Sequence, residues 1–212
     1  MRIVGGELSG RTFSGPGGDR TRPTSERVRE GIFSALQARG AIDGARVLDT
    51  YAGTAALAFE ALSRGAASAL SVERDGRNIK AITSDARSLG LSARHRVLSL
   101  DLDRGLDRLE SEPFDLIFCD PPWADLARAV EVLSRLVAIR LAPTGLLVLI
   151  HAARDRHPAI GHSATPHSAT QHSAMQQMAI SADYRYGDTA VVIYAAAPDR
   201  DDDDLDAEVK AT

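Results

Sequence analysis

The sequence predicts an α/β fold built around a doubly wound, mostly parallel sheet with helices on both faces. Two observations favour this fold. From residue 45 onward, short apolar segments typical of strands alternate with longer segments typical of helices, which is the pattern of parallel βαβ units. Acidic residues also follow four consecutive predicted strands, and the carboxyl ends of strands form the ligand-binding edge of such a sheet.

The central elements follow one another closely along the chain. We expect strands at 46–50, 68–73, 95–100, 114–119 and 145–150. Helices are expected between them, at 54–64, 75–89, 102–110 and 125–140. Two more strands, near 177–186 and 190–196, complete the sheet, with a turn around Tyr184–Asp188. These elements define a domain over residues 40–197.

Residues 1–39 form an N-terminal extension in this scheme. Their first part, 1–23, is rich in glycine and arginine and predicts a short β-hairpin and a loop. A helix should begin at Thr24 or Ser25, either of which can cap it, and run to about Arg39. Apolar residues recur on one face of this helix: Val28, Ile32, Phe33 and Leu36.

Length and composition limit the class of protein. With 212 residues, of which 44% are apolar, the chain can form one well-packed domain. No apolar run approaches the roughly 20 residues that span a bilayer, and the first residues lack the apolar region of a signal peptide. Cys119 is the sole cysteine, so no intrachain disulfide can form. We expect a cytoplasmic protein in which Cys119 is a buried core thiol.

The net charge of −4 is unevenly distributed. Residues 199–212 carry seven acids against two basic residues, a net of −5, which leaves about +1 for the rest. Residues 1–39 carry seven arginines against four acids, a net of +3. Like-charge runs are usually solvated. We therefore expect a disordered acidic tail over residues 198–212 and a basic N-terminal extension.

A histidine repeat lies before the last strand pair. His157, His162, His167 and His172 recur every five residues. His-rich tracts can bind metal, but here proline, glycine and serine interrupt any regular structure, and no acid or cysteine joins the histidines. We expect a flexible loop over residues 154–176 and no metal site.

The segment Phe114–Cys119 ends abruptly in Asp120-Pro121-Pro122-Trp123. Proline cannot donate to a sheet ladder, so the two prolines end the strand in a rigid turn. That turn holds a carboxylate, backbone carbonyls and an aromatic ring close together. The ring can stack on a planar base while the oxygens accept N–H hydrogens, which suits methylation of an exocyclic amine. An ordinary proline turn is the alternative interpretation.

A second motif, Val47–Ala55, predicts a strand, a tight turn and the start of a helix. Small residues let the backbone approach a ligand, but the G-x-G-x-x-G fingerprint of dinucleotide sites is missing. An Asp-x-x-x-Gly turn without a phosphate cradle suits S-adenosylmethionine, which has no phosphate. The turn residues expected to bind this cofactor are Asp49, Tyr51, Gly53, Thr54 and Ala55.

Two further strand ends complete the expected cofactor site. Glu73, beside Arg74, can accept the hydrogens of two ribose hydroxyls, as an acid at a similar spacing does in dinucleotide folds. Asp101, beside Leu102, can accept hydrogens of the adenine amine. Acids at four consecutive strand ends are harder to explain as polar loop residues than any one of them alone.

With these residues placed, the chain resembles the bacterial family that methylates the N2 amine of one guanine in 16S ribosomal RNA, the small-subunit methyltransferase D family. The Asp120 motif is shared by many amino methyltransferases, whereas the Arg22–Glu30 segment together with the N-terminal Gly-Gly is specific. Four segments carry the resemblance: Met1–Gly6 with Gly10-Arg11, Arg22–Glu30 with Ile32-Phe33, Asp49–Gly65, and Asp120–Trp123.

The resemblance implies a class I methyltransferase fold that uses S-adenosylmethionine, with guanine held at Asp120–Trp123 and the N-terminal extension, residues 1–39, facing the RNA. It also implies 16S ribosomal RNA within an assembling small subunit as the substrate, and we expect a monomer. Two departures matter: Ala55 replaces a glycine, where its methyl group would crowd the cofactor, and Trp123 replaces the usual Phe or Tyr. The residues expected to contact RNA phosphates are Arg11, Arg22, Arg27 and Arg29.

Two other functions fit parts of the pattern. A DNA adenine-N6 methyltransferase would use the same Asp-Pro-Pro-aromatic turn, although no separate target-recognition region is visible beyond residues 1–39. A non-catalytic RNA-binding or ribosome-assembly factor would keep the fold without turnover, and Ala55 is the feature that favours this alternative.

Overall fold

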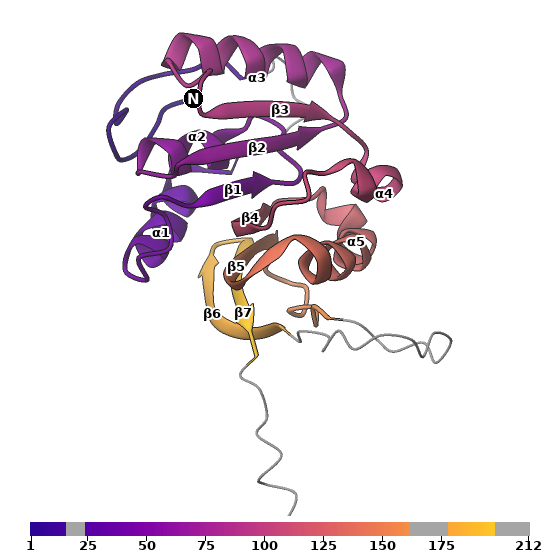
Figure 1. Ribbon diagram of the computed structural model, residues 1–212. Coiled ribbons are helices and arrows are strands. Elements are labelled where there is room, and N and C mark those ends of the chain that lie inside the picture. The colour runs from indigo at the N-terminus through magenta and orange to yellow at the C-terminus, as the bar shows by residue number, and fades with distance from the viewer. Residues whose placement is uncertain (16–23, 162–177, 198–212) are drawn as a thin grey trace, which may run out of the picture.

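The computed structural model describes residues 1–15, 24–161 and 178–197, which form a sheet flanked by helices (Figure 1). The helices are α1 (Glu26–Gln37), α2 (Ala56–Ser63), α3 (Gly76–Leu89), α4 (Leu102–Gly105) and α5 (Leu126–Arg140), with the 3-10 helices η1 (Leu106–Arg108) and η2 (Trp123–Asp125). The strands are β1 (Arg46–Asp49), β2 (Ser68–Glu73), β3 (His95–Ser99), β4 (Phe114–Cys119), β5 (Leu141–Ala152), β6 (Met178–Tyr186) and β7 (Thr189–Ala196).

The strands form one seven-stranded mixed sheet in the order β3-β2-β1-β4-β5-β7-β6. The first five strands of that order, from β3 to β5, are all parallel to one another. Only β7 runs antiparallel to its two neighbours, β5 and β6. The predicted doubly wound, mostly parallel sheet is therefore confirmed, with the last two strands added as an antiparallel hairpin.

Three of the boundary differences have a clear local cause. β5 begins at Leu141 rather than at 145, because Leu141 pairs with Phe114 and both side chains are buried. The helix predicted over 102–110 is split at Gly105, whose φ of −150° leaves the helical region, and it continues as η1. α2 begins at Ala56 because Ala55 has left-handed backbone angles.

The two faces of the sheet carry separate cores, and helices cover both, as predicted. Phe118 packs with residues of α1, α2 and α3 on one face. Ile117 packs with residues of α4, η1 and α5 on the other. Neighbouring strand residues point to opposite faces, which is why these two residues of β4 belong to different cores. Cys119 is fully buried in the second core, as expected of a structural thiol.

The N-terminal segment is fastened to α2. Arg2 and Thr12 pair as an isolated antiparallel bridge, so the predicted hairpin is present as a bridged turn without two regular strands. The carboxylate of Glu60 on α2 accepts the backbone N–H groups of Val4 at 2.9 Å and Gly5 at 2.7 Å. The segment therefore packs on the same helix that begins at the turn after β1.

Several predictions fall outside the described residues: those for Arg22, for His162, His167 and His172, and for the tail at 198–212. His157 is described, and its Nδ1 lies 3.1 Å from Nε2 of His151. Within the described ranges, no three His, Cys, Asp or Glu side chains are grouped so that they could hold a metal ion. In the same ranges, none of the helices has the length and apolar character needed to cross a membrane.

Candidate functional site

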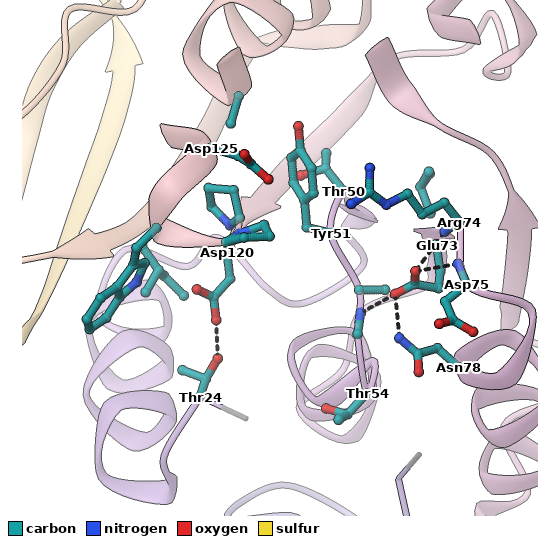
Figure 2. Close-up of a pocket in the computed structure, with 18 of the residues that line it drawn as sticks. Thr24, Thr50, Tyr51, Thr54, Glu73, Arg74, Asp75, Asn78, Asp120 and Asp125 are labelled. Carbon is teal, nitrogen blue, oxygen red and sulfur yellow. Dashed lines mark hydrogen bonds between the residues drawn. The ribbon is translucent and has the colours of Figure 1, made fainter. Parts of the chain in front are cut away.

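A cavity of about 990 Å³ opens at the carboxyl ends of β1, β2, β3 and β4. These strands are parallel neighbours, so the segments that follow them converge at one edge of the sheet. In the view of Figure 2, Glu73 and Asp120 lie on opposite sides of the cavity. The predicted residues that line it are Arg27, Tyr51, Gly53, Thr54, Glu73, Arg74, Asp101, Leu102, Asp120, Pro121, Pro122 and Trp123.

The carboxylate of Glu73 joins the turn after β1 to the start of α3 (Figure 2). Its Oε2 accepts the backbone N–H of Gly53 at 2.9 Å and the side-chain N–H of Asn78 at 3.2 Å. Its Oε1 accepts the backbone N–H groups of Arg74 at 2.7 Å and Asp75 at 2.8 Å. Four N–H donors thus hold this carboxylate in one orientation at the cavity wall.

The turn after β1 contains two residues with left-handed backbone angles, Gly53 with φ of 53° and Ala55 with φ of 57°. Ala55 is the only non-glycine residue in the described ranges with a positive φ. Its side chain is fully buried in the core that contains α2 and does not line the cavity. The methyl group packs into the core, so this geometry does not support the expectation that it crowds the cofactor.

Asp49, at the end of β1, is 1% exposed and does not line the cavity. Within the described residues, neither of its carboxylate oxygens makes a hydrogen bond of normal geometry, although the backbone N–H of Ala58 interacts with the carboxylate. Burial, with a smaller contribution from repulsion by Asp120 and Glu73, raises the pKa of Asp49 to about 7 against the opposing effect of the Ala58 backbone N–H. These three carboxylates, which we call the acidic cluster, concentrate negative charge at the sheet edge, an arrangement that suits a cationic ligand.

Asp101 and Tyr51 contribute to the same wall. The carboxylate of Asp101 accepts the backbone N–H of Asp103 at 3.2 Å and caps α4. Burial raises the pKa of the Tyr51 phenol above its usual range, so the ring stays neutral at physiological pH. The wall therefore offers one further carboxylate and a neutral hydroxyl on an aromatic ring.

The Asp120 turn forms the opposite wall. β4 ends at Cys119, and Pro122 with φ of −52° leads the chain into η2. The hydroxyl of Thr24, in the segment before α1, donates a hydrogen bond to Oδ2 of Asp120 (Figure 2). Trp123 is half-buried and lines the cavity. A carboxylate and an aromatic ring therefore face the same space as the Glu73 wall.

The predicted RNA-binding arginines have different surroundings. Arg27 is exposed and lines the cavity. Arg11 donates to the backbone carbonyls of Ser88 at 2.6 Å and Leu89 at 3.1 Å, at the end of α3. Arg29 is only 2% exposed. Its predicted contact with a phosphate is wrong, because a guanidinium buried inside the protein cannot reach an RNA backbone.

Sequence reasoning missed several residues that line the cavity, among them Thr24 and Tyr186. The only local signal at Thr24 is its place beside the helix cap Ser25. Tyr186 lies at the end of β6 and packs on α1 at Gly31, where an added side-chain carbon would come within 1.9 Å of the Tyr186 hydroxyl. Glycine at this helix position is a weak signal of such a close approach.

The strand order, the glycine turn after β1 and the acid at the end of β2 together define the fold of class I methyltransferases. A family model described as Conserved hypothetical protein 95 matches residues 1–193. The chain therefore belongs to this family of methyltransferase-like proteins, and the predicted resemblance is confirmed.

Individual relatives agree with this assignment. The ribosomal RNA small subunit methyltransferase D of Escherichia coli is 35% identical over 123 residues, which are 58% of this chain and 60% of that protein, less than two thirds of its length. The solved structure of yhhF from Escherichia coli is 27% identical, with a TM-score of 0.71 over 92% of this chain and 97% of that one. An RNA methyltransferase from Salinibacter ruber, solved with S-adenosyl-L-homocysteine, shares the fold at 13% identity, with a TM-score of 0.57 over 85% of this chain and 97% of that one.

Proposed function

We propose that the protein transfers a methyl group from S-adenosylmethionine to the exocyclic N2 amine of a guanine in 16S ribosomal RNA of the small subunit. The observation that carries the proposal is that the Asp120–Trp123 turn and the turn bonded to Glu73 line one cavity. A place for the cofactor and a place for a base thus share one space. The name of the Escherichia coli relative supports ribosomal RNA as the substrate.

The residues present fit S-adenosylmethionine. Glu73 and Asp101 line the cavity and would accept hydrogens from the ribose hydroxyls and the adenine amine. The acidic cluster would balance the positive charge of the cofactor, since Glu73 and Asp120 line the cavity and a cation nearby would favour the charged form of the buried Asp49. When bound, this cofactor supplies a methyl group on a positively charged sulfur.

At the opposite wall, the chain would bind and orient the guanine amine. The lone pair of this amine is delocalised into the ring, so its orientation matters more than full deprotonation. The Asp120 carboxylate and the Pro121 carbonyl would accept its two N–H hydrogens, and Trp123 would stack on the base. Alignment and fixed acceptors would then supply much of the rate. The guanine must leave its stack to reach such a cavity.

RNA binding is proposed to depend on the basic N-terminal extension. Arg27 is exposed at the cavity and is the candidate best placed to contact a phosphate near the target base. Arg22 would add a phosphate contact. Arg11 would add another through the N–H groups that it does not use in its two bonds to backbone carbonyls. Such contacts position the RNA without reading its sequence. We propose that the substrate is an assembling small subunit and that the protein acts as a monomer.

The test is methyl transfer from labelled S-adenosylmethionine to small ribosomal subunits purified from cells that lack this enzyme. Duplex DNA serves as the competing substrate and Asp120→Ala as the variant. We expect label as N2-methylguanine in 16S ribosomal RNA, with turnover reduced at least about 100-fold by Asp120→Ala. Cofactor affinity, measured by calorimetry, should change by no more than a few fold, because Asp120 acts on the base.

Other outcomes point elsewhere. Label only in DNA adenine would reassign the protein to the adenine methyltransferases. RNA binding without label and without cofactor affinity would indicate a binding factor. Equal losses of turnover and cofactor affinity in Asp120→Ala would make Asp120 a structural residue.

A further inference from the structure

Thr24 links the N-terminal extension to the Asp120 turn. Its hydroxyl donates to Oδ2 of Asp120, although the two residues are 96 positions apart in the sequence (Figure 2). Both residues line the cavity. Thr24 is not the cap of α1, because the side chain of the next residue, Ser25, accepts the N–H of Val28 at 3.3 Å. The Thr24 hydroxyl is therefore available to act on the site instead of on the helix.

The backbone of Thr24 is held in place from inside the protein. Its carbonyl accepts Nη1 of Arg29 at 3.0 Å. The same guanidinium donates through Nη2 to the carbonyl of Arg2 at 2.5 Å, and its Nε lies 3.9 Å from the carboxylate of Glu60. Arg29 is 2% exposed and Glu60 is fully buried. The buried Arg29 guanidinium, with Glu60 beside it, thus holds the backbone from which the Thr24 hydroxyl reaches Asp120.

We infer that Thr24 is a positioning residue for methyl transfer, held by the Arg29–Glu60 pair; this inference rests on the proposed function. Threonine is branched at Cβ and has few side-chain rotamers, so its hydroxyl is a well-defined donor. A carboxylate has about four acceptor positions, so one bond from Thr24 is compatible with a second from a guanine amine. The Thr24 bond would hold the Asp120 carboxylate in the orientation that accepts that amine.

The test compares three variants of the full-length protein in the subunit methylation assay. Thr24→Val keeps the shape of the side chain and removes the hydroxyl, and Thr24→Ser restores the hydroxyl. Thr83→Val makes the same chemical change on the exposed face of α3, where the Thr83 hydroxyl donates to the carbonyl of Ile79 at 2.8 Å. We would measure kcat, KM for subunits, the dissociation constant of S-adenosylmethionine and the thermal midpoint.

We expect Thr24→Val to lower kcat by about 10- to 100-fold, the range for losing a hydrogen bond to a charged group. Its cofactor affinity and KM should stay within about threefold, since the hydroxyl acts on the orientation of Asp120. Thr24→Ser should recover at least a third of the wild-type kcat, and Thr83→Val should match the wild type. This split between kcat and binding is not expected of a residue that only stabilises the fold.

Three results would overturn the inference while the proposed function stands: an unchanged kcat in Thr24→Val, a parallel loss of cofactor affinity, or a Thr24→Ser variant as slow as Thr24→Val. If the wild type methylates no guanine, the proposed function fails, and the role of Thr24 fails with it. The wild-type control therefore separates the two failures within one experiment.

Discussion

Asp49→Asn should stabilise the protein at neutral and alkaline pH. The Asp49 carboxylate is buried, and within the described residues its oxygens make no hydrogen bond of normal geometry. Burial raises its pKa to about 7 from an ordinary value of 3.8, so the folded protein holds the proton more tightly than the unfolded chain. The stability contributed by the neutral acid is fully present below about pH 4 and is lost as the pH rises toward 7. Asparagine cannot ionise and avoids this loss.

The size of the effect follows from the two pKa values. A difference of about three pH units corresponds to about 4 kcal/mol, at about 1.4 kcal/mol per unit. The protonated carboxyl and the amide have similar shape and polarity, so the variant and the wild type should be nearly equally stable in acid. We expect Asp49→Asn to be more stable by about 1 kcal/mol at pH 4.5 and by about 4 kcal/mol at pH 8.

Urea unfolding of cofactor-free protein at pH 4.5, 6 and 8 measures this difference. Asp107→Asn is the matched control, because Asp107 is exposed and its substitution should give no pH-dependent difference. The reasoning is refuted if Asp49→Asn is less stable than the wild type at pH 8, or if its advantage is the same at all three pH values. The same variant should bind S-adenosylmethionine more weakly, because the acidic cluster loses a negative charge.

Three further predictions concern backbone strain, packing and buried charge. Ala55→Gly removes the strain of an alanine with left-handed backbone angles, but it also increases the conformational entropy of the unfolded chain and removes a buried methyl group. The free energy of unfolding should therefore change by less than about 1 kcal/mol. Cofactor affinity, measured by calorimetry, should change less than twofold because Ala55 does not line the cavity. Gly31→Ala should displace Tyr186 from α1 and lower kcat in the subunit methylation assay at least about fivefold; an unchanged rate would mean that the Tyr186 ring can move without affecting the cavity. Glu60→Gln removes the buried negative charge that lies 2.9 Å from Arg64 and 3.9 Å from Arg29, and it should lower the free energy of unfolding in urea by about 3 kcal/mol or more. Glu26→Gln, which breaks an exposed ion pair, should leave that free energy nearly unchanged.

The parts of the fold that could be predicted depend on local patterns. Alternating apolar segments locate the parallel strands, and a parallel sheet places all their carboxyl ends at one edge. Glu73, Asp101 and Asp120 were therefore predictable as neighbours, and all three line the cavity. The prolines after Cys119 correctly predict the end of β4 for the same reason, since a missing N–H is a local property.

The parts that could not be predicted depend on contacts between distant segments. Arginine is usually a surface residue, and only the packing of Arg29 beside Glu60 in the folded structure reveals that this one is buried. The bond from Thr24 to Asp120 joins segments 96 residues apart. The direction of the Ala55 methyl group depends on backbone angles that alanine seldom adopts. A comparison of alanine with glycine at this position suggests that the methyl group crowds the cofactor, whereas in the structure it packs into the core.

These contacts change how the N-terminal extension should be tested. Ile32 and Phe33 of α1 are fully buried in the same core as residues of α2 and the sheet, and the buried Arg29–Glu60 pair crosses between the two. A protein lacking residues 1–39 would lose part of its core together with Thr24, so its inactivity would not show that the extension binds RNA. A point substitution at exposed Arg27 avoids this ambiguity. Arg27→Ala should weaken RNA binding and lower its salt dependence by about one counterion, while cofactor affinity and the thermal midpoint stay unchanged. A salt dependence equal to that of the wild type would instead place the RNA phosphates on other residues, and the role proposed for Arg27 would be wrong.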